Sequence, residues 1–179
     1  MQKYLRFPSQ CRRRRPPWAL RFVALRAAAW FLIGVHGLGV AQPMATNEYQ
    51  LKAAFLFNFL QFVDWPASAF AGPETALSIC VLGPDPFGAD LDTIIAGEHI
   101  GGREVQVQRF AQIDSVDGCH LLFVNLRSQP QLRRALERLK GQPTLTVGDT
   151  TPFANLGGMI EFVTQDDRIR LRVNLRAAS

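Results

Sequence analysis

The segment that decides the fold is NEYQLKAAFLFNFLQFVDWP, residues 47–66, which is apolar and crowded with aromatic side chains. A helix that crosses a bilayer needs about 20 predominantly apolar residues. Lys52, Asn58 and Gln61 divide this segment into apolar runs of at most five residues. The segment is therefore expected to form a helix of a globular domain rather than a membrane span.

Helix start and stop signals frame the segment. Asn47 and Gln50 form a capping box, and Pro66 disfavours helical conformation in the residues just before it. These signals predict a helix of about 17 residues. Its apolar residues form two adjacent stripes, Leu51, Phe55, Phe59 and Phe62 in one and Leu56, Leu60 and Val63 in the other. We therefore expect the helix to be largely buried.

Two polar residues of this helix need separate explanations. The aliphatic part of Lys52 can lie along the apolar surface while its ammonium group reaches solvent. A buried Asn58 would need hydrogen-bond partners, most simply backbone groups of a neighbouring loop. We interpret both as structural residues, and the alternative is that they contact a partner.

The residues before the helix have the order of a secretory signal. The first 26 residues contain eight basic residues and no acidic one, and the apolar segment AAAWFLIGVHGLGVAQ follows. Small residues at the end of that segment predict cleavage after Ala41. Residues 1–41 are therefore expected to be a signal peptide, and residues 45–178 to form one α/β domain. The alternative is an uncleaved amino-terminal anchor, for which the apolar segment is short.

Removal of the signal would reverse the sign of the net charge. The whole chain has a formal net charge of +5. Without the eight basic residues of the signal, 12 basic and 15 acidic residues remain, a net charge of about −3. Composition therefore gives no support to a nucleic-acid partner.

Strand and helix patterns alternate along the rest of the chain. The expected strands are residues 76–83, 103–110, 119–125 and 143–149, followed by a hairpin of residues 158–164 and 168–174. Helices are expected after Asp85 and after Ser128, the latter with core positions Leu132, Ala135, Leu136 and Leu139. The cations of that last helix form either a solvated face or a docking site for an acidic partner. The order predicts an α/β fold, a mainly parallel sheet flanked by helices with a C-terminal antiparallel hairpin.

Motifs for chemistry are absent from the expected domain. His99 and His120 have no second ligand at metal-binding spacing. The segment LGPDPFG, residues 82–88, follows a strand, where α/β proteins often bind ligands, but its glycines match no nucleotide motif and favour a simple turn. Residues 149–151, Asp-Thr-Thr, could serve a hydrolase, yet no nucleophile motif accompanies them. The sequence predicts no catalytic residue, no cofactor and no metal.

Cys80 and Cys119 are the cysteines that remain after removal of the signal. An even number of cysteines in an exported protein suggests a disulfide. A disulfide would close a loop over the 39 positions that separate the two cysteines and would stabilise the fold by roughly 4 kcal/mol in the chain-entropy description. The alternative is a pair of small buried residues that never bond, because adjacent strands do not always allow the geometry.

The order of these segments resembles the YfiR family of small periplasmic proteins. The matching segments are YQLKAAFLFNFLQFVDWP, CVLGPDPFG, GGREVQV, CHLLFV, PTLTVGD, GGMIEF and RIRLRVN, which span essentially the whole expected domain. The family's opening helix motif corresponds here to Tyr49, Lys52, Ala53, Ala54, Phe55, Leu56, Asn58, Phe59, Phe62, Trp65 and Pro66. The resemblance implies that Cys80 and Cys119 match one family cysteine pair, whereas a second pair has no counterpart.

The resemblance also implies a regulator rather than an enzyme. The expected function is to bind and inhibit the periplasmic sensor domain of an inner-membrane diguanylate cyclase, lowering cyclic-di-GMP and biofilm formation. Expected partners are that domain or a sensor kinase, an outer-membrane lipoprotein that counteracts the inhibitor, and a second copy of the chain. Family members usually continue into a carboxy-terminal helix, whereas this sequence stops at LRAAS. Part of the sheet is expected to be uncovered if the protein ends there, and the alternative is a truncated gene sequence.

The rival hypotheses are a periplasmic small-molecule-binding module and an enzyme without a recognisable motif. A binding module predicts a deep apolar pocket with a few polar groups near the carboxyl ends of the strands. A regulator predicts an exposed apolar patch instead.

Overall fold

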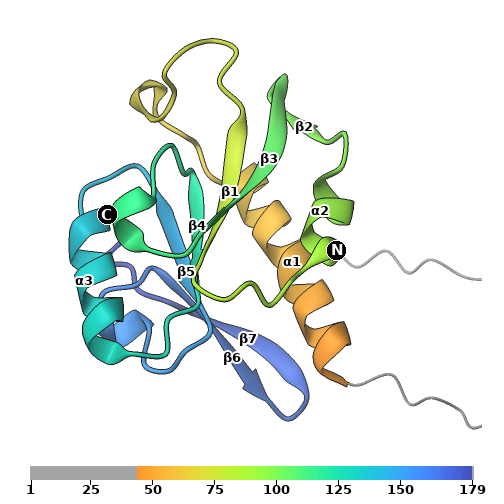
Figure 1. Cartoon of the computed structure of the whole chain (residues 1–179). Coiled ribbons are helices and arrows are strands. Elements are labelled where there is room, and N and C mark those ends of the chain that lie inside the picture. Colours follow the sequence, from red (N-terminus) through yellow and green to blue (C-terminus); the bar gives the residue numbers. More distant parts are fainter. Residues whose placement is uncertain (1–43, 179) are drawn as a thin grey trace, which may run out of the picture. The chain divides into compact units, whose positions relative to one another are not determined.

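A seven-stranded sheet forms the centre of the domain in the computed structural model, which describes residues 44–178 (Figure 1). The expected signal peptide, residues 1–41, lies outside the described residues. The strands are β1 (Leu77–Leu82), β2 (His99–Ile100), β3 (Arg103–Phe110), β4 (Leu121–Val124), β5 (Leu145–Gly148), β6 (Ile160–Gln165) and β7 (Arg168–Val173), and their order in the sheet is β2-β3-β1-β4-β5-β6-β7.

The direction of the strands confirms the predicted fold class. Neighbouring strands from β3 to β6 pair in parallel, whereas β2 pairs antiparallel with β3 and β7 antiparallel with β6. The C-terminal pair is the expected hairpin. The two-residue strand β2 was not expected, because so short a strand leaves no alternating pattern in the sequence.

Helices cover both faces of the sheet. Helices α1 (Met44–Phe62) and α2 (Ala89–Ile95) lie on one side and α3 (Gln129–Leu139) on the other (Figure 1). Short 3-10 helices η1 (Ala67–Ala69), η2 (Ile113–Ser115) and η3 (Ala154–Leu156) lie in the connections. A hydrophobic core lies on each face of the sheet. Leu77, Ile79 and Val81 of β1 belong to the core beneath α1 and α2, and Cys80 and Leu82 belong to the core beneath α3.

Helix α1 differs from the sequence prediction in two ways. It begins at Met44, so Asn47 lies inside the helix and is not its N-cap. Its fully buried apolar residues are Ala53, Leu56 and Leu60, whereas Leu51 and Phe62 of the aromatic stripe are 49% and 83% exposed. The expectation that the helix is largely buried was wrong for Leu51 and Phe62, whereas Phe55 and Phe59 of the same stripe are partly buried against the core. A helix lying on a sheet buries only the side chains that face the sheet.

The turn after β1 requires glycine at position 83. Gly83 has a φ of 94°, in the left-handed region, and a Cβ there would collide with the backbone carbonyl oxygen of Asn125. We predict that Gly83→Ala lowers the free energy of unfolding by about 2 kcal/mol, measured by urea denaturation. Gly88→Ala is the matched control, because Gly88 also has positive φ but open space around it, and should cost about 1 kcal/mol. Equal losses of stability in the two variants would show that the structure around residue 83 moves to accommodate the added methyl group.

Candidate functional site

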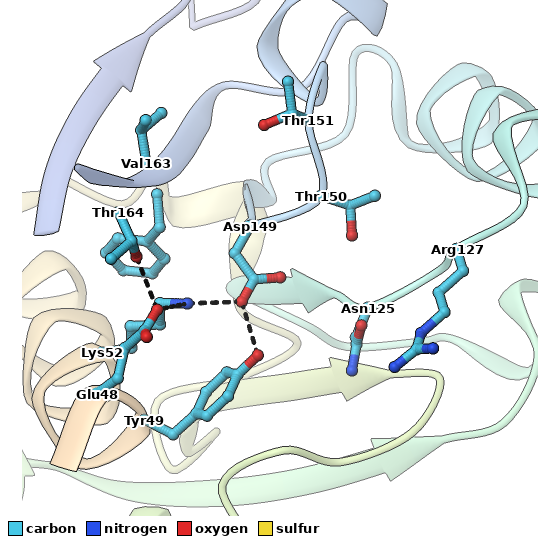
Figure 2. A pocket seen from close by; sticks show the side chains of 11 residues that line it. Glu48, Tyr49, Lys52, Asn125, Arg127, Asp149, Thr150, Thr151, Val163 and Thr164 are labelled. Atoms are coloured by element: carbon cyan, nitrogen blue, oxygen red, sulfur yellow. Dashed lines mark hydrogen bonds and ion pairs between the residues drawn. The ribbon is translucent and has the colours of Figure 1, made fainter. Parts of the chain in front are cut away.

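A polar pocket of ≈ 430 Å³ opens at the edge of the sheet where the parallel strands end (Figure 2). Its lining comes from α1, from the segments after β4 and β5, and from β6: Glu48, Tyr49, Lys52, Asn125, Arg127, Asp149, Thr150, Thr151, Phe162, Val163 and Thr164. The crossover after β1 uses α2 on one face, and the crossover after β4 uses α3 on the other. Ligands of α/β proteins bind near the point where the crossovers diverge in this way.

The pocket is built around the ammonium group of Lys52. Lys52 Nζ lies 2.7 Å from Asp149 Oδ2 and 2.7 Å from Glu48 Oε1, and the lysine side chain is 4% exposed. Tyr49 donates its hydroxyl hydrogen to the same Asp149 oxygen at 3.0 Å. Figure 2 shows these side chains converging from α1 and from the end of β5. We call Glu48, Tyr49, Lys52 and Asp149 the Lys52 clamp.

Electrostatics favour the charged forms of Lys52 and Glu48 at neutral pH. Burial alone would lower the pKa of Lys52, but its hydrogen bonds to Asp149 and Glu48 outweigh burial and raise that pKa. The hydrogen bond from Lys52, with a second from Thr164, lowers the pKa of Glu48. Burial, followed by the negative charge of Asp149, raises the pKa of Tyr49, which therefore remains a hydroxyl donor. The clamp thus joins α1 to the end of β5 through paired charges.

The clamp corrects the expected role of Lys52. Its ammonium group does not reach solvent but is buried against two carboxylates.

The residues that line the pocket outside the clamp include Arg127, which is exposed. Thr151 donates to Glu161, whose carboxylate also accepts from the backbone N–H of Ala154. The pocket is therefore a polar depression rather than the deep apolar cavity of a binding module, and the hydrolase interpretation of residues 149–151 gains no support.

The other residues of the opening-helix motif have separate positions. Phe55 and Phe59 contact the ring of Phe162 in β6, each with 6.0 Å between ring centroids. Asn58 is exposed, so it needs none of the buried hydrogen-bond partners that we considered for it. Trp65 donates its indole N–H to the Leu60 carbonyl at 3.2 Å. Phe62 and Pro66 are exposed, so the motif does not form one site.

The structure contains a disulfide between Cys80 of β1 and Cys119, with 5.9 Å between their Cα atoms. Both residues belong to the core beneath α3. Cys119 precedes β4, the strand that pairs with β1, and this proximity brings the two sulfur atoms together. The sequence alone left open whether the pair bonds.

Neither histidine of the described chain lies in a metal site. His99 is exposed and its Nδ1 contacts the Gly97 carbonyl, while His120 is buried. No group of three potential metal ligands occurs among residues 44–178.

The turn of residues 82–88 is stabilised by ion pairs of Arg109, which contacts Asp85 of the turn and Asp92 of α2 at 2.6 Å each.

Exposed apolar side chains lie where α1 passes over the β6–β7 hairpin. Leu171 and Val173 of β7 are 42% and 50% exposed, and they pair with Phe162 and Ile160 of β6. They therefore share the sheet face that α1 covers. Strand β7 is the last strand of the sheet, so its outer backbone edge faces no further strand within the described residues.

Helix α1 also exposes apolar side chains, Leu51 and Phe62. It runs antiparallel to β6, because Glu48 contacts Thr164 whereas Phe59 contacts Phe162. Phe62, three residues beyond Phe59, is the last residue of the helix and is 83% exposed. We call Leu171 and Val173 of β7 the edge surface. Leu51 and Phe62 were expected in the core, and no local signal shows which residues of an apolar stripe will remain exposed at its ends.

Comparison with known proteins identifies the family. The family model described as YfiR/HmsC-like matches residues 49–179, so the chain belongs to the YfiR/HmsC-like family. The resemblance inferred from the sequence is confirmed. This is a family of periplasmic regulatory proteins, and a disulfide fits an oxidising compartment. A comparison with curated proteins finds no match. Among residues 44–178, no helix combines the length and apolar character that a bilayer crossing requires.

Proposed function

We propose that this protein is a periplasmic inhibitor that binds the periplasmic sensor domain of an inner-membrane diguanylate cyclase and so lowers cyclic-di-GMP. The observation that carries the proposal is the family match across residues 49–179. The disulfide supports export, with residues 1–41 acting as a cleaved signal peptide. An outer-membrane lipoprotein would compete for the inhibitor, and the sensor domain of a kinase is the alternative partner.

The edge surface is the part of the described chain best suited to the partner. Exposed apolar groups beside an open strand can bind by apolar burial and by strand addition. Arg168, Arg170 and Arg172 occupy the opposite face of β7. Charges on an edge strand also discourage unselective pairing. A partner strand added to the edge of β7 would therefore place apolar side chains on the face of Leu171 and Val173 and acidic side chains on the face of the arginines.

Inhibition requires only a difference in affinity between two states of the cyclase. A ligand shifts an equilibrium by the ratio of its affinities for the two states. A difference of about 2.7 kcal/mol shifts the cyclase roughly a hundredfold towards its inactive state. A few buried apolar side chains can supply that difference.

Gene deletion tests the function. Loss of the protein should raise cellular cyclic-di-GMP and biofilm formation, and the effect should vanish when the partner cyclase is deleted as well. An unchanged nucleotide level in the single deletion, together with a small molecule retained by the purified protein, would favour the binding-module hypothesis instead.

A surface variant tests the location of the interface. Leu171→Glu should weaken binding to the cyclase sensor domain about tenfold or more, because it places a charge among apolar contacts. Gln129→Glu is the control, since it adds the same charge at the start of α3 on the other side of the sheet. Isothermal titration calorimetry would measure both. If the two variants bind equally well, the interface lies elsewhere.

A further inference from the structure

The imidazole of His120 is buried at the amino-terminal ends of β1 and β4, with 1% of the residue exposed. Its Nδ1 accepts a hydrogen bond from the backbone N–H of Ser78 at 3.1 Å. An imidazole nitrogen that accepts carries no proton, so the neutral ring carries its proton on Nε2. Nε2 is buried and has no hydrogen-bond partner within the described residues. The site therefore accommodates the neutral ring.

The ring packs against the connection between α1 and β1. Trp65 meets it edge to face with 5.5 Å between centroids, and Phe70 lies at 4.7 Å. Arg103 of β3 lies 3.9 Å from the centre of the Phe70 ring. Its guanidinium group also donates to three backbone carbonyls of the same connection, those of Gly72, Pro73 and Thr75. His120 and Arg103 together hold this connection, which we call the 65–75 segment.

A second proton on the ring would break this arrangement. Protonated Nδ1 would be a donor facing the Ser78 N–H, which is also a donor. Arg103 is the charged group that acts on the ring, and it has the same sign as imidazolium. Burial lowers the pKa of His120, an interaction with the backbone of Ala69 partly opposes the effect of burial, and the charge of Arg103 lowers the pKa further. The other groups around the ring, Trp65 and Phe70 from the 65–75 segment and Ser78 from β1, are uncharged.

We infer that His120 is a proton-operated latch: when its imidazole becomes charged, the ring leaves its site and the 65–75 segment opens. In the open state the imidazole lies in water and has the ordinary pKa of about 6.5, which is higher than its pKa in the closed state. Above that pH the ring is neutral in both states, and pH has no effect. Below a pH of about 6.5, the ratio of open to closed molecules rises by up to about tenfold per pH unit as the pH falls, until the pH reaches the pKa of His120 in the closed state. The proposal is independent of the identity of any partner.

Trp65 provides a direct readout of opening. The chain has two other tryptophans, Trp18 and Trp30, so the emission of Trp65 is obtained by subtracting the spectrum of the full-length Trp65→Phe protein. Between pH 7.5 and 5.0 we expect the emission maximum of Trp65 to move to longer wavelength, with unchanged far-ultraviolet circular dichroism. The maximum is the measured quantity, because a charged imidazole can quench a touching indole without any movement. Amide hydrogen exchange in the 65–75 segment, corrected for intrinsic rates, should rise about tenfold or more.

Two histidine variants separate the latch from general acid effects. His120→Asn keeps an acceptor for the Ser78 N–H but cannot become charged, so it should abolish the shift. His99→Gln removes the exposed histidine and should leave the shift unchanged. A constant emission maximum in the unmodified protein, or the same shift in His120→Asn, would overturn the proposal.

A measurement on the unmodified protein covers the case in which His120→Asn does not fold. The carbon-bound ring protons of His120 report its titration by nuclear magnetic resonance. The midpoint of that titration should coincide with the midpoint of the Trp65 emission shift. Titration of His120 without accompanying changes in emission and exchange would show that the ring charges in place and would refute the latch.

Discussion

Replacing Lys52 by methionine is expected to lower the free energy of unfolding by about 3–5 kcal/mol, because it leaves buried negative charge without its cation. Asp149 and Glu48, the two carboxylates bonded to Lys52, have side chains that are 12% and 32% exposed. Methionine keeps most of the aliphatic packing of lysine, so the loss reports the charge rather than the volume. Urea denaturation at neutral pH measures the change.

Two further variants isolate the ionic contribution. Lys140→Met removes an exposed lysine just beyond α3 and should change stability by less than about 0.5 kcal/mol. Adding Asp149→Asn to Lys52→Met removes one of the stranded charges and should recover part of the loss. If Lys52→Met and Lys140→Met have the same small effect, the Lys52 clamp contributes little to stability.

Most of the sheet could be predicted because its strands are marked locally. Runs such as residues 76–83 and 119–125 combine β-forming apolar residues with turn residues at their ends, and both become central strands. Helix α3 was equally well marked, and its expected core positions, Leu132, Ala135, Leu136 and Leu139, are all buried. Alternation of these elements then determines the fold class, since parallel strands need crossovers between them.

The Lys52 clamp could not be predicted, because its parts are far apart in the sequence. Lys52 and Asp149 are separated by 97 positions, and no local pattern relates them. A lysine inside an apolar helix is compatible with an exposed ammonium group or with a buried ion pair, and only the tertiary structure distinguishes the two. The exposure of Phe62 has a similar cause, since a helix that is apolar on most sides does not reveal which side the sheet will cover.

Removing the disulfide by the double substitution Cys80→Ala and Cys119→Ala is expected to lower the free energy of unfolding by about 4 kcal/mol. The sequence separation of the two cysteines is 39 residues, and a cross-link over that distance restricts the unfolded chain by roughly this amount. The unfolded chain should also become more expanded, so the denaturant dependence of stability should increase. Urea denaturation provides both quantities in one experiment.

Reduction of the unmodified protein separates the cross-link from the packing of the sulfur atoms, both of which lie in the core beneath α3. A reductant should destabilise the unmodified protein by several kcal/mol, because it breaks the bond between the sulfur atoms, adds a hydrogen to each and leaves both side chains in place. The double variant should not respond to the reductant, since it has no bond to break. If the unmodified protein is equally stable with and without reductant while the double variant is destabilised, the loss reflects a cavity left by two small buried side chains. In that case the two cysteines act as core residues, and the cross-link contributes nothing to the stability of the fold.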